Sequence, residues 1–180
     1  MKEKILICIY TVNINEKLVL DILEKIQKPI AKWDHEILIL INSSGESIAN
    51  AVSDSIKKSN LFNVRILFNL QNLGYGGNQK LAFHYAIKHN FDFALLLAGS
   101  GQYAPEQIES LVSALVETNS QAVVGSRFLN KNSDVKNQMP FYKYLGIKAI
   151  TFFQNLVLGM NFSEFHSGFR VYRVKALADI

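Results

Sequence analysis

A glycine-rich segment and the strand after it carry the residues best suited to binding a phosphate-bearing ligand. The segment reads Asn-Leu-Gly-Tyr-Gly-Gly-Asn-Gln-Lys over residues 72–80 and leads into an apolar-faced helix. A glycine-rich turn that opens a helix exposes backbone N–H groups, which attract an anion. A buried strand at 91–97 then empties into a second polar loop at 98–106. Because α/β sheets bind ligands at the carboxyl ends of their parallel strands, we expect both loops to border one site.

The spacing of these glycines fits neither of the two common nucleotide-binding fingerprints. Gly74, Gly76 and Gly77 do not follow a first strand as Gly-x-Gly-x-x-Gly, and no Gly-Lys-Ser/Thr closes the segment. The sequence therefore argues against a dinucleotide-binding fold and against a P-loop NTPase. The alternative is purely structural, since a tight entry into a helix also favours a glycine that adopts positive φ.

Charged residues elsewhere in the chain supply candidates for acid–base work and for phosphate binding. Glu164 is the best candidate for a general base, because a carboxylate can take a proton from a hydroxyl within hydrogen-bond reach. Lys80, Arg127, Arg170 and Arg173 could offset phosphate charge, and the guanidinium fork matches phosphate oxygens. The structural alternatives are that Glu164 pairs with Arg170 or caps a turn, and that the arginines form ordinary ion pairs.

Composition and charge bound the class of protein. The chain has 180 residues with 49% hydrophobic and 19% charged, the profile of one globular domain with a sizeable core. A net charge of +4 suits an anionic ligand or an anionic membrane surface, but no Lys/Arg block indicates nucleic acid. The lone Cys8 excludes an intrachain disulfide and is expected in the core. No signal peptide is visible, and polar residues interrupt the best candidate span, 144–160, so we expect a cytoplasmic protein, either free or peripheral to a membrane.

Strand and helix patterns alternate along the chain, which predicts an α/β fold with a mostly parallel sheet covered by helices on both faces. The expected strands are 5–10, 36–41, 64–68, 91–97, Ala122–Val124 and 171–173, and the expected helices are 15–27, 46–57, 78–89, 105–118 and Phe141–Leu158. The last helix is interpreted as core, with a lipid-facing surface as the alternative. A polar loop at 130–138 is expected to be mobile and to close over an occupied site. We expect one domain over residues 1–180, shortened at its C-terminus, because the chain stops inside an uncapped helical pattern.

Several segments taken in order resemble glycosyltransferase family 2. They are the stretches at 72–80, 101–106, 125–128, 139–140 and 164–170, which read Asn-Leu-Gly-Tyr-Gly-Gly-Asn-Gln-Lys, Gly-Gln-Tyr-Ala-Pro-Glu, Gly-Ser-Arg-Phe, Met-Pro and Glu-Phe-His-Ser-Gly-Phe-Arg. The resemblance is greatest to the dolichyl- and polyprenyl-phosphate sugar transferases and covers nearly the whole chain. It implies the GT-A fold and an inverting transfer of sugar from a nucleotide-sugar donor, with a polyprenyl phosphate at a membrane surface as a candidate acceptor.

The resemblance also implies a role for particular residues. The nucleoside would be held by Thr11, Asn13, Asn42 and Ser44, and the rest of the nucleotide would lie beside Gly74, Gly76, Lys80, Ser100, Gln102 and Arg127. A Mg²⁺ or Mn²⁺ ion would sit on the diphosphate near the loop after residue 97. Glu164 would activate the acceptor, and Arg170 would hold a phosphate close by.

The chain departs from the family where the family places its carboxylates. Ile41 and Asn42 occupy the positions of two consecutive aspartates, and Ala98, Gly99 and Ser100 replace Asp-x-Asp. Two hypotheses follow: a transferase, supported by the intact segment at 164–170, and a catalytically inactive binding or scaffolding subunit, supported by the missing carboxylates. Calorimetric titration with UDP- and GDP-sugars, with and without Mn²⁺, would best reduce the uncertainty between the two hypotheses. The sugar, the nucleotide base, the acceptor and the oligomeric state cannot be read from the sequence.

The missing carboxylates predict weak binding of divalent metal, because Mg²⁺ and Mn²⁺ favour anionic oxygen ligands and Ser100 offers only a hydroxyl. We expect Ser100→Asp, combined with Ala98→Asp, to increase the affinity for a nucleotide measured by calorimetry in the presence of Mn²⁺. The same titration without metal should show no gain. Tight Mn²⁺ binding at this loop in the unsubstituted protein would contradict the assignment.

Overall fold

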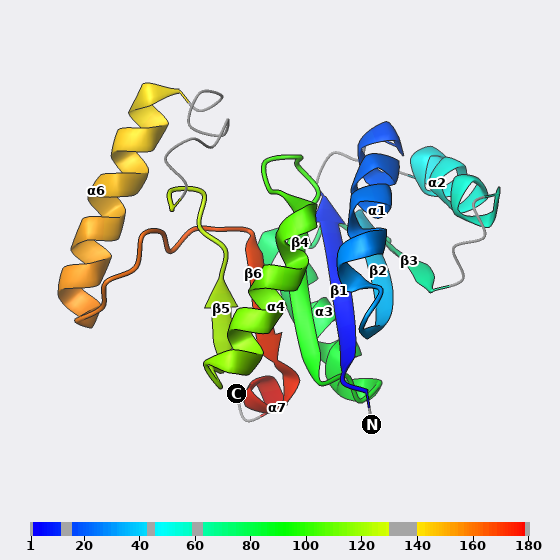
Figure 1. Ribbon diagram of the computed structural model, residues 1–180. Coiled ribbons are helices and arrows are strands. Elements are labelled where there is room, and N and C mark those ends of the chain that lie inside the picture. Colours follow the sequence, from blue (N-terminus) through cyan, green and yellow to red (C-terminus); the bar gives the residue numbers. More distant parts are fainter. Residues whose placement is uncertain (1, 12–15, 43–45, 59–62, 130–139, 179–180) are drawn as a thin grey trace.

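The protein is an α/β fold built on a six-stranded sheet with helices on both faces (Figure 1). The structure is a computed structural model. It describes residues 2–11, 16–42, 46–58, 63–129 and 140–178. The side chains of residues 11, 46–48 and 178 lie outside this description. The strands are β1 (Lys4–Thr11), β2 (Asp34–Asn42), β3 (Val64–Asn69), β4 (Phe93–Ala98), β5 (Ala122–Val124) and β6 (Phe169–Arg173). Their order across the sheet is β3-β2-β1-β4-β6-β5. The mostly parallel sheet expected from the sequence is confirmed.

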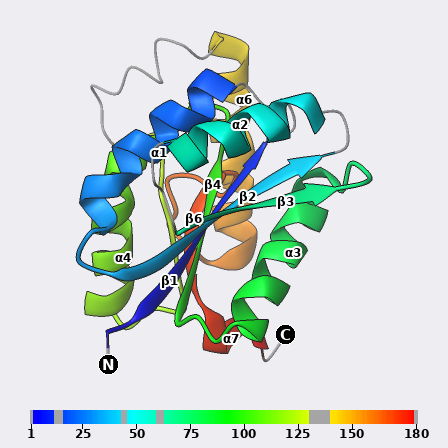
Figure 2. The same ribbon diagram turned by 90° about the vertical axis from the view of Figure 1, so that its right-hand side faces the viewer.

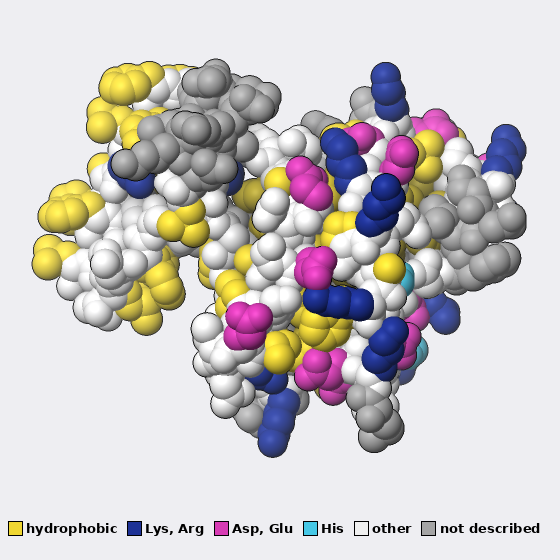
Figure 3. Space-filling view, in the orientation of Figure 1, with side chains coloured by type: hydrophobic (Ala, Val, Ile, Leu, Met, Phe, Trp, Pro, Cys, Tyr) yellow, Lys and Arg dark blue, Asp and Glu magenta, His cyan; other side chains and the backbone are white. Residues whose placement is uncertain are grey.

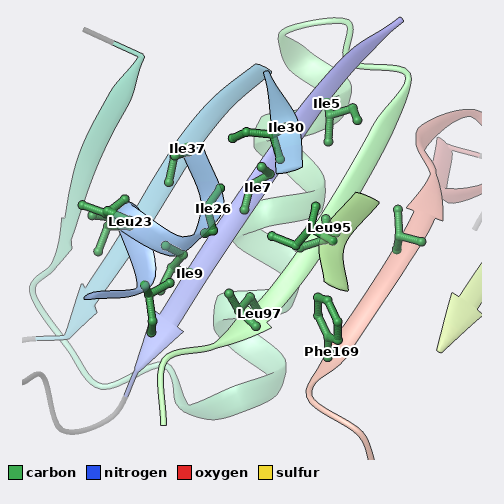
Figure 4. Close-up of a cluster of buried hydrophobic side chains, with 14 of the residues drawn as sticks. Ile5, Ile7, Ile9, Leu23, Ile26, Ile30, Ile37, Leu95, Leu97 and Phe169 are labelled. Atoms are coloured by element: carbon green, nitrogen blue, oxygen red, sulfur yellow. The ribbon is translucent and has the colours of Figure 1, made fainter. Parts of the chain in front are cut away.

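The central strand β1 shows why the sheet needs helices on both faces. Its apolar side chains alternate between two cores: Ile5, Ile7 and Ile9 belong to one, and Leu6 and Cys8 belong to the other. All five are essentially inaccessible to solvent, as expected for a strand buried on both faces. The first core, drawn in Figure 4, packs against α1, α2 and α4, and the second packs against α3 and α7. Figure 2 shows α1 and α4 on one side of the sheet and α3 on the other.

The helices follow the predicted pattern, with two informative differences. They are α1 (Glu16–Ile30), α2 (Glu46–Lys58), α3 (Gly74–Lys88), α4 (Ile108–Glu117) after a short 3₁₀ turn η2 (Pro105–Gln107), α6 (Phe141–Leu158) and α7 (Val174–Ala178). Helix α1 was expected to end before Pro29, but it continues through Pro29 to Ile30. Ile26 and Ile30 lie four residues apart on the buried face, so their packing stabilises one more turn.

The glycine-rich segment forms the first turn of α3, whereas the sequence predicted a turn that precedes the helix. Gly74, at φ +62°, begins the helix in a conformation that L side chains rarely adopt. A Cβ on Gly77 would lie 2.7 Å from the Cβ of Leu73, so the close helix entry needs a glycine there. The structural reading of the segment is therefore confirmed.

Strand β6 runs antiparallel to both of its neighbours, β4 and β5. A strand in this direction begins at the edge where the parallel strands end, so residues 164–168 arrive at the carboxyl ends of β1 and β4. The expected strand at 171–173 lies within β6, and the direction of β6 brings the motif at 164–170 to the predicted ligand edge.

Helix α6 stands beyond the β5 edge of the sheet (Figure 1) and is not part of the core, so the interpretation of it as core was wrong. Phe152, Phe153 and Val157 are 64%, 63% and 81% exposed, and Thr151 is the buried residue of the helix. The loop predicted at 130–138 lies outside the described residues.

The junction between the sheet and residue 168 predicts a sharp difference between two glycines. A Cβ on Gly168 would meet the Tyr10 hydroxyl at 2.7 Å and the Ala98 Cβ at 2.9 Å, while a Cβ on Gly146 in α6 meets nothing within 4 Å. We expect Gly168→Ala to lower the free energy of unfolding by about 1–3 kcal/mol through overpacking. Gly146→Ala, the same chemical change, should be neutral or stabilising by up to about 1 kcal/mol because alanine favours the helix. Urea denaturation measures both, and equal effects would contradict the packing argument.

Candidate active site

Gly168 connects several segments at the carboxyl edge of the sheet by hydrogen bonds. It lies near the ends of β1 and β4, the two neighbouring strands between which the order of strands along the chain reverses. The backbone oxygen of Gly168 accepts hydrogen bonds from the Ala98 N–H at 3.0 Å and from the Tyr10 hydroxyl at 3.2 Å. Its N–H donates to the Tyr103 hydroxyl at 2.6 Å. Burial, with a further contribution from Tyr75, raises the pKa of Tyr10 well above its ordinary value, so the hydroxyl keeps its proton. The structure thus fixes β1, β4, the loop after β4 and the start of β6 to one another.

Glu164 forms a buried ion pair with Arg127. Its side chain is 0% exposed and that of Arg127 is 10% exposed. The backbone N–H of Arg127 donates to Oε2 of Glu164 at 2.9 Å, and its Nε donates to Oε1 at 2.9 Å, with a second guanidinium nitrogen on the same oxygen. Burial alone would lower the pKa of Arg127, but the hydrogen bond and the charge of Glu164 outweigh it and raise the pKa. The hydrogen bonds therefore hold the two side chains in one fixed geometry.

The pair extends to the loop after β4. Nη1 of Arg127 donates to Oε1 of Gln102 at 3.3 Å. Three residues predicted for the site from separate motifs, Gln102, Arg127 and Glu164, are thus brought into one hydrogen-bonded network.

Arg170 does not pair with Glu164, so that alternative was wrong. Its Nε donates to the Ser167 carbonyl at 2.6 Å, and a terminal nitrogen donates to the Phe165 carbonyl at 2.7 Å. The guanidinium therefore ties the turn before β6 to the strand. Burial lowers the pKa of Arg170, but the hydrogen bond with Tyr172 and the nearby tyrosines outweigh burial, so the pKa is raised.

Arg173 lies at the opposite end of β6 and is not a site residue. It bonds the carbonyls of Ser120 and Leu115 at 2.9 and 3.2 Å and packs over the ring of Phe93, the first residue of β4. The sequence could not separate Arg170 from Arg173, because only the direction of β6 decides which of them reaches the carboxyl edge.

Three buried asparagines connect the ends of β2 and β3 to the glycine-rich turn. Asn78 donates through Nδ2 to the Gly74 carbonyl at 2.8 Å, so its Oδ1 is the acceptor for Nδ2 of Asn69 at 2.9 Å. Asn69 Nδ2 also donates to Oδ1 of Asn42 at 3.3 Å. This order leaves the Nδ2 of Asn42 as a donor that has no partner among the described residues. The sequence singled out Asn42 alone, although asparagine at 69 and 78 flanks the glycines and was a usable signal.

The remaining predicted residues fall into two groups. Ser100 and Lys80 are exposed, the first in the loop after β4 and the second on α3. Asn13, Ser44 and the side chain of Thr11 lie outside the described residues. Gly76 is in the first turn of α3, two residues after Gly74.

The residues at this edge do not fit a protein-held divalent metal. No group of three or more His, Cys, Asp or Glu residues that could hold an ion occurs in the part of the chain that the structure describes. The acidic residue of the network, Glu164, has both oxygens bonded to Arg127. Asn42, Ala98 and Ser100 offer neutral groups or none.

Comparison with known proteins matches this arrangement of motifs to one family. Residues 5–180 match the model of glycosyl transferase family 2. The chain belongs to that family. It is 31% identical over 107 residues to a UDP-N-acetylglucosamine–dolichyl-phosphate N-acetylglucosaminyltransferase of Methanococcus voltae, covering 59% of this chain and 42% of the relative. It is 25% identical over 117 residues to an undecaprenyl-phosphate mannosyltransferase of Micrococcus luteus, covering 65% and 46%.

Solved structures share the fold of this family 2 chain, which is the GT-A fold. A mannosyltransferase from Pyrobaculum calidifontis, in complex with GDP-Man and Mn²⁺, aligns with a TM-score of 0.60 at 14% identity over 97% of this chain and 46% of that one. The S. aureus TarS structure aligns with a TM-score of 0.55 at 16% identity over 99% and 49%. The family 2 chain thus spans about half the length of these two structural relatives.

The buried Arg127–Glu164 pair predicts a large stability effect for a small chemical change. Glu164→Gln keeps the shape but leaves the Arg127 charge without its counter-ion, and breaking a buried pair costs about 3–5 kcal/mol. Glu109→Gln, the matched control, removes the carboxylate of the half-exposed pair with Lys32 and should cost less than about 1 kcal/mol. Urea denaturation compares them. A Glu164→Gln variant as stable as Glu109→Gln would show that the pair contributes little.

Proposed function

We propose that this protein transfers a sugar from a nucleotide-sugar donor to a polyprenyl phosphate, with inversion at the sugar carbon. The observation that carries the proposal is the Gln102–Arg127–Glu164 network at the carboxyl edge of a family 2 fold. Guanidinium groups match phosphate oxygens, and this one is held in place by a buried carboxylate. The names of two relatives, a dolichyl-phosphate and an undecaprenyl-phosphate transferase, support the choice of acceptor.

The nucleoside would lie at the ends of β1 and β2, where Asn42 presents its Nδ2 as a donor. A ligand carbonyl or ring nitrogen would satisfy this buried group, which is costly to leave without a partner. We also propose Thr11 and Asn13, at the end of β1, and Ser44, after β2, for the same subsite. Gly74, Gly76 and Lys80 would lie along the rest of the nucleotide.

Negative charge on the departing diphosphate would be stabilised by groups of this chain, since the described residues at this edge do not fit a protein-held metal. The first turn of α3 follows β3 at this edge, so the positive end of the helix dipole would favour a phosphate there, although the Gly74 N–H already donates to Oδ1 of Asn72 at 2.9 Å. The exposed Lys80 adds a cation on the same helix. We propose that these groups, with Ser100 and Gln102 on the facing loop, hold the diphosphate while the bond to the sugar breaks.

Glu164 acts in this proposal through Arg127, which makes it a positioning residue. Both of its oxygens accept hydrogen bonds from Arg127, and its side chain is 0% exposed. A polyprenyl phosphate arrives as an anion, so its oxygen can attack without losing a proton to a base. Arg127 would orient that phosphate, and Arg170 would keep the turn at 165–167 in shape beside it.

A hydroxyl acceptor would require a different role for Glu164. In that case Glu164 would take the acceptor proton, as the resemblance implies, after Arg127 moves to free an oxygen. Loss of a general base typically slows transfer on the order of a hundredfold or more.

A double-mutant cycle distinguishes the two roles. If Glu164 works through Arg127, then Glu164→Gln, Arg127→Gln and the double variant should reduce kcat/KM by similar factors, because the residues act as a unit. If Glu164 is an independent base, the effects should multiply, and the Glu164→Gln rate should lose its dependence on a basic group in the pH profile. Donor affinity, measured by calorimetry, should hardly change in either case.

A catalytically inactive binding or scaffolding subunit is the second candidate, favoured by the neutral residues Asn42, Ala98 and Ser100 at the positions of family carboxylates. Titration with UDP- and GDP-sugars, each with and without Mn²⁺, tests it. The transferase hypothesis predicts donor binding that depends little on Mn²⁺, together with turnover of a prenyl phosphate. Donor binding without turnover under every condition would favour the inactive relative, and no binding of either donor would contradict the proposed site.

A further inference from the structure

We propose that the outward face of α6 docks on the surface of an anionic lipid bilayer. This face is the set of exposed residues along one side of the helix. It consists of Phe141, Tyr142, Leu145, Gly146, Ala149, Ile150, Phe152, Phe153, Leu156 and Val157. At 100° per residue these positions form one continuous half of the helix surface. Figure 3 shows hydrophobic side chains projecting along α6.

The polar and apolar sides of α6 are placed opposite to those of a helix that covers a core. The residues turned toward the protein are Tyr144, Ile147, Lys148, Thr151, Gln154 and Asn155, which recur at three- and four-residue spacing and are mostly polar. The ring of Phe128 packs against Tyr144, at 5.6 Å between ring centroids, and lies 4.8 Å from the Lys148 ammonium. A helix with its polar side toward the protein and its apolar side outward is suited to an apolar phase outside the molecule, either a membrane or a protein partner.

Charge identifies the kind of phase. No Asp or Glu occurs between residues 140 and 163, whereas the exposed Lys143 flanks the apolar face. Lysines near a membrane surface are attracted by anionic headgroups, and acidic residues would be repelled. Phe and Leu side chains on such a helix enter the boundary between headgroups and acyl chains.

The outward face suits lipid better than a protein partner. Protein interfaces contain about one hydrogen bond per 100–200 Å². The polar side-chain group on this face is the single Tyr142 hydroxyl, so it offers almost no directional contact to a second copy or to another protein. Among the described residues no helix is long and apolar enough to cross a membrane, so docking would be parallel to the surface.

The position of α6 in the chain connects this surface to the candidate site. The helix follows Arg127 and precedes Glu164, the two members of the buried pair. Its end is fixed to the returning chain, because Asn155 donates to the Phe162 carbonyl and accepts from the Phe162 N–H, both at 2.8 Å. Docking would bring the Arg127–Glu164 pair close to the bilayer. The use of this position, to meet a lipid-phosphate acceptor, rests on the proposed function.

Vesicle sedimentation with the full chain tests the proposal. The unsubstituted protein should bind vesicles of phosphatidylcholine mixed with phosphatidylglycerol more tightly than phosphatidylcholine alone. Leu145→Gln with Leu156→Gln should reduce the partition coefficient by about tenfold or more, because two leucines that would enter the bilayer are lost. The control, Leu70→Gln with Ile87→Gln, removes two exposed apolar side chains from other elements and should leave binding unchanged. Lys143→Gln should reduce binding to the anionic vesicles about fivefold and hardly affect neutral ones.

Three results would overturn the docking surface: no binding of the unsubstituted protein to anionic vesicles, equal loss in the α6 and control variants, or a concentration-dependent dimer in sedimentation velocity that the α6 substitutions abolish. Transfer assays separate this inference from the proposed function. The α6 variant should retain transfer to a water-soluble short-chain prenyl phosphate and lose transfer to an acceptor embedded in vesicles. Absence of transfer with either acceptor, accompanied by normal vesicle binding, would refute the proposed function and leave the docking surface standing.

Discussion

A carboxylate that is fully removed from water needs a cation beside it, and the arrangement of this protein's candidate site follows from how Glu164 meets that need. Arg127 supplies three donors to the two oxygens of Glu164, one from its backbone and two from its guanidinium. The desolvation of both charges is offset only if this geometry is kept. The pair therefore fixes the turn after β5 to the segment before β6, two parts of the chain separated by the whole of α6.

The antiparallel direction of β6 is the second constraint. It brings Gly168 under the Tyr10 and Tyr103 hydroxyls, where the absence of a Cβ is what allows the three segments to approach. The same direction sends Arg173 to the far end of the sheet and keeps Arg170 near the site. A site that depends on a buried pair and a tight backbone junction is preorganised, which is the property that electrostatic stabilisation of a departing phosphate requires.

The departures from the pattern that the family resemblance implies have one property in common: each leaves a neutral residue where a carboxylate is expected. The candidate site therefore consists largely of neutral and cationic groups. Asn42, which stands where the family resemblance implies a carboxylate, takes part in an amide relay with Asn69 and Asn78, and this relay orients its remaining N–H₂. A carboxylate at 42 would instead accept hydrogen bonds and add negative charge. The relay also attaches the glycine-rich turn of α3 to β2 and β3, so one set of hydrogen bonds holds both the nucleoside end and the phosphate end of the proposed donor site.

Local sequence determined much of this protein: the alternating strands and helices, the mostly parallel sheet, the buried Cys8 and the motifs that place the chain in its family. These features follow from runs and periods of apolar residues over short distances, because the spacing of apolar residues determines which face of a helix or strand can be buried. The tertiary structure alone decided the direction of β6, the exposure of α6 and the partner of Glu164. The sequence offered Arg170, six residues away, as one alternative partner, but the partner is Arg127, 37 residues away. Spacing along the chain cannot reveal a contact made across it, and an apolar helix has the same pattern whether a core or a bilayer covers it.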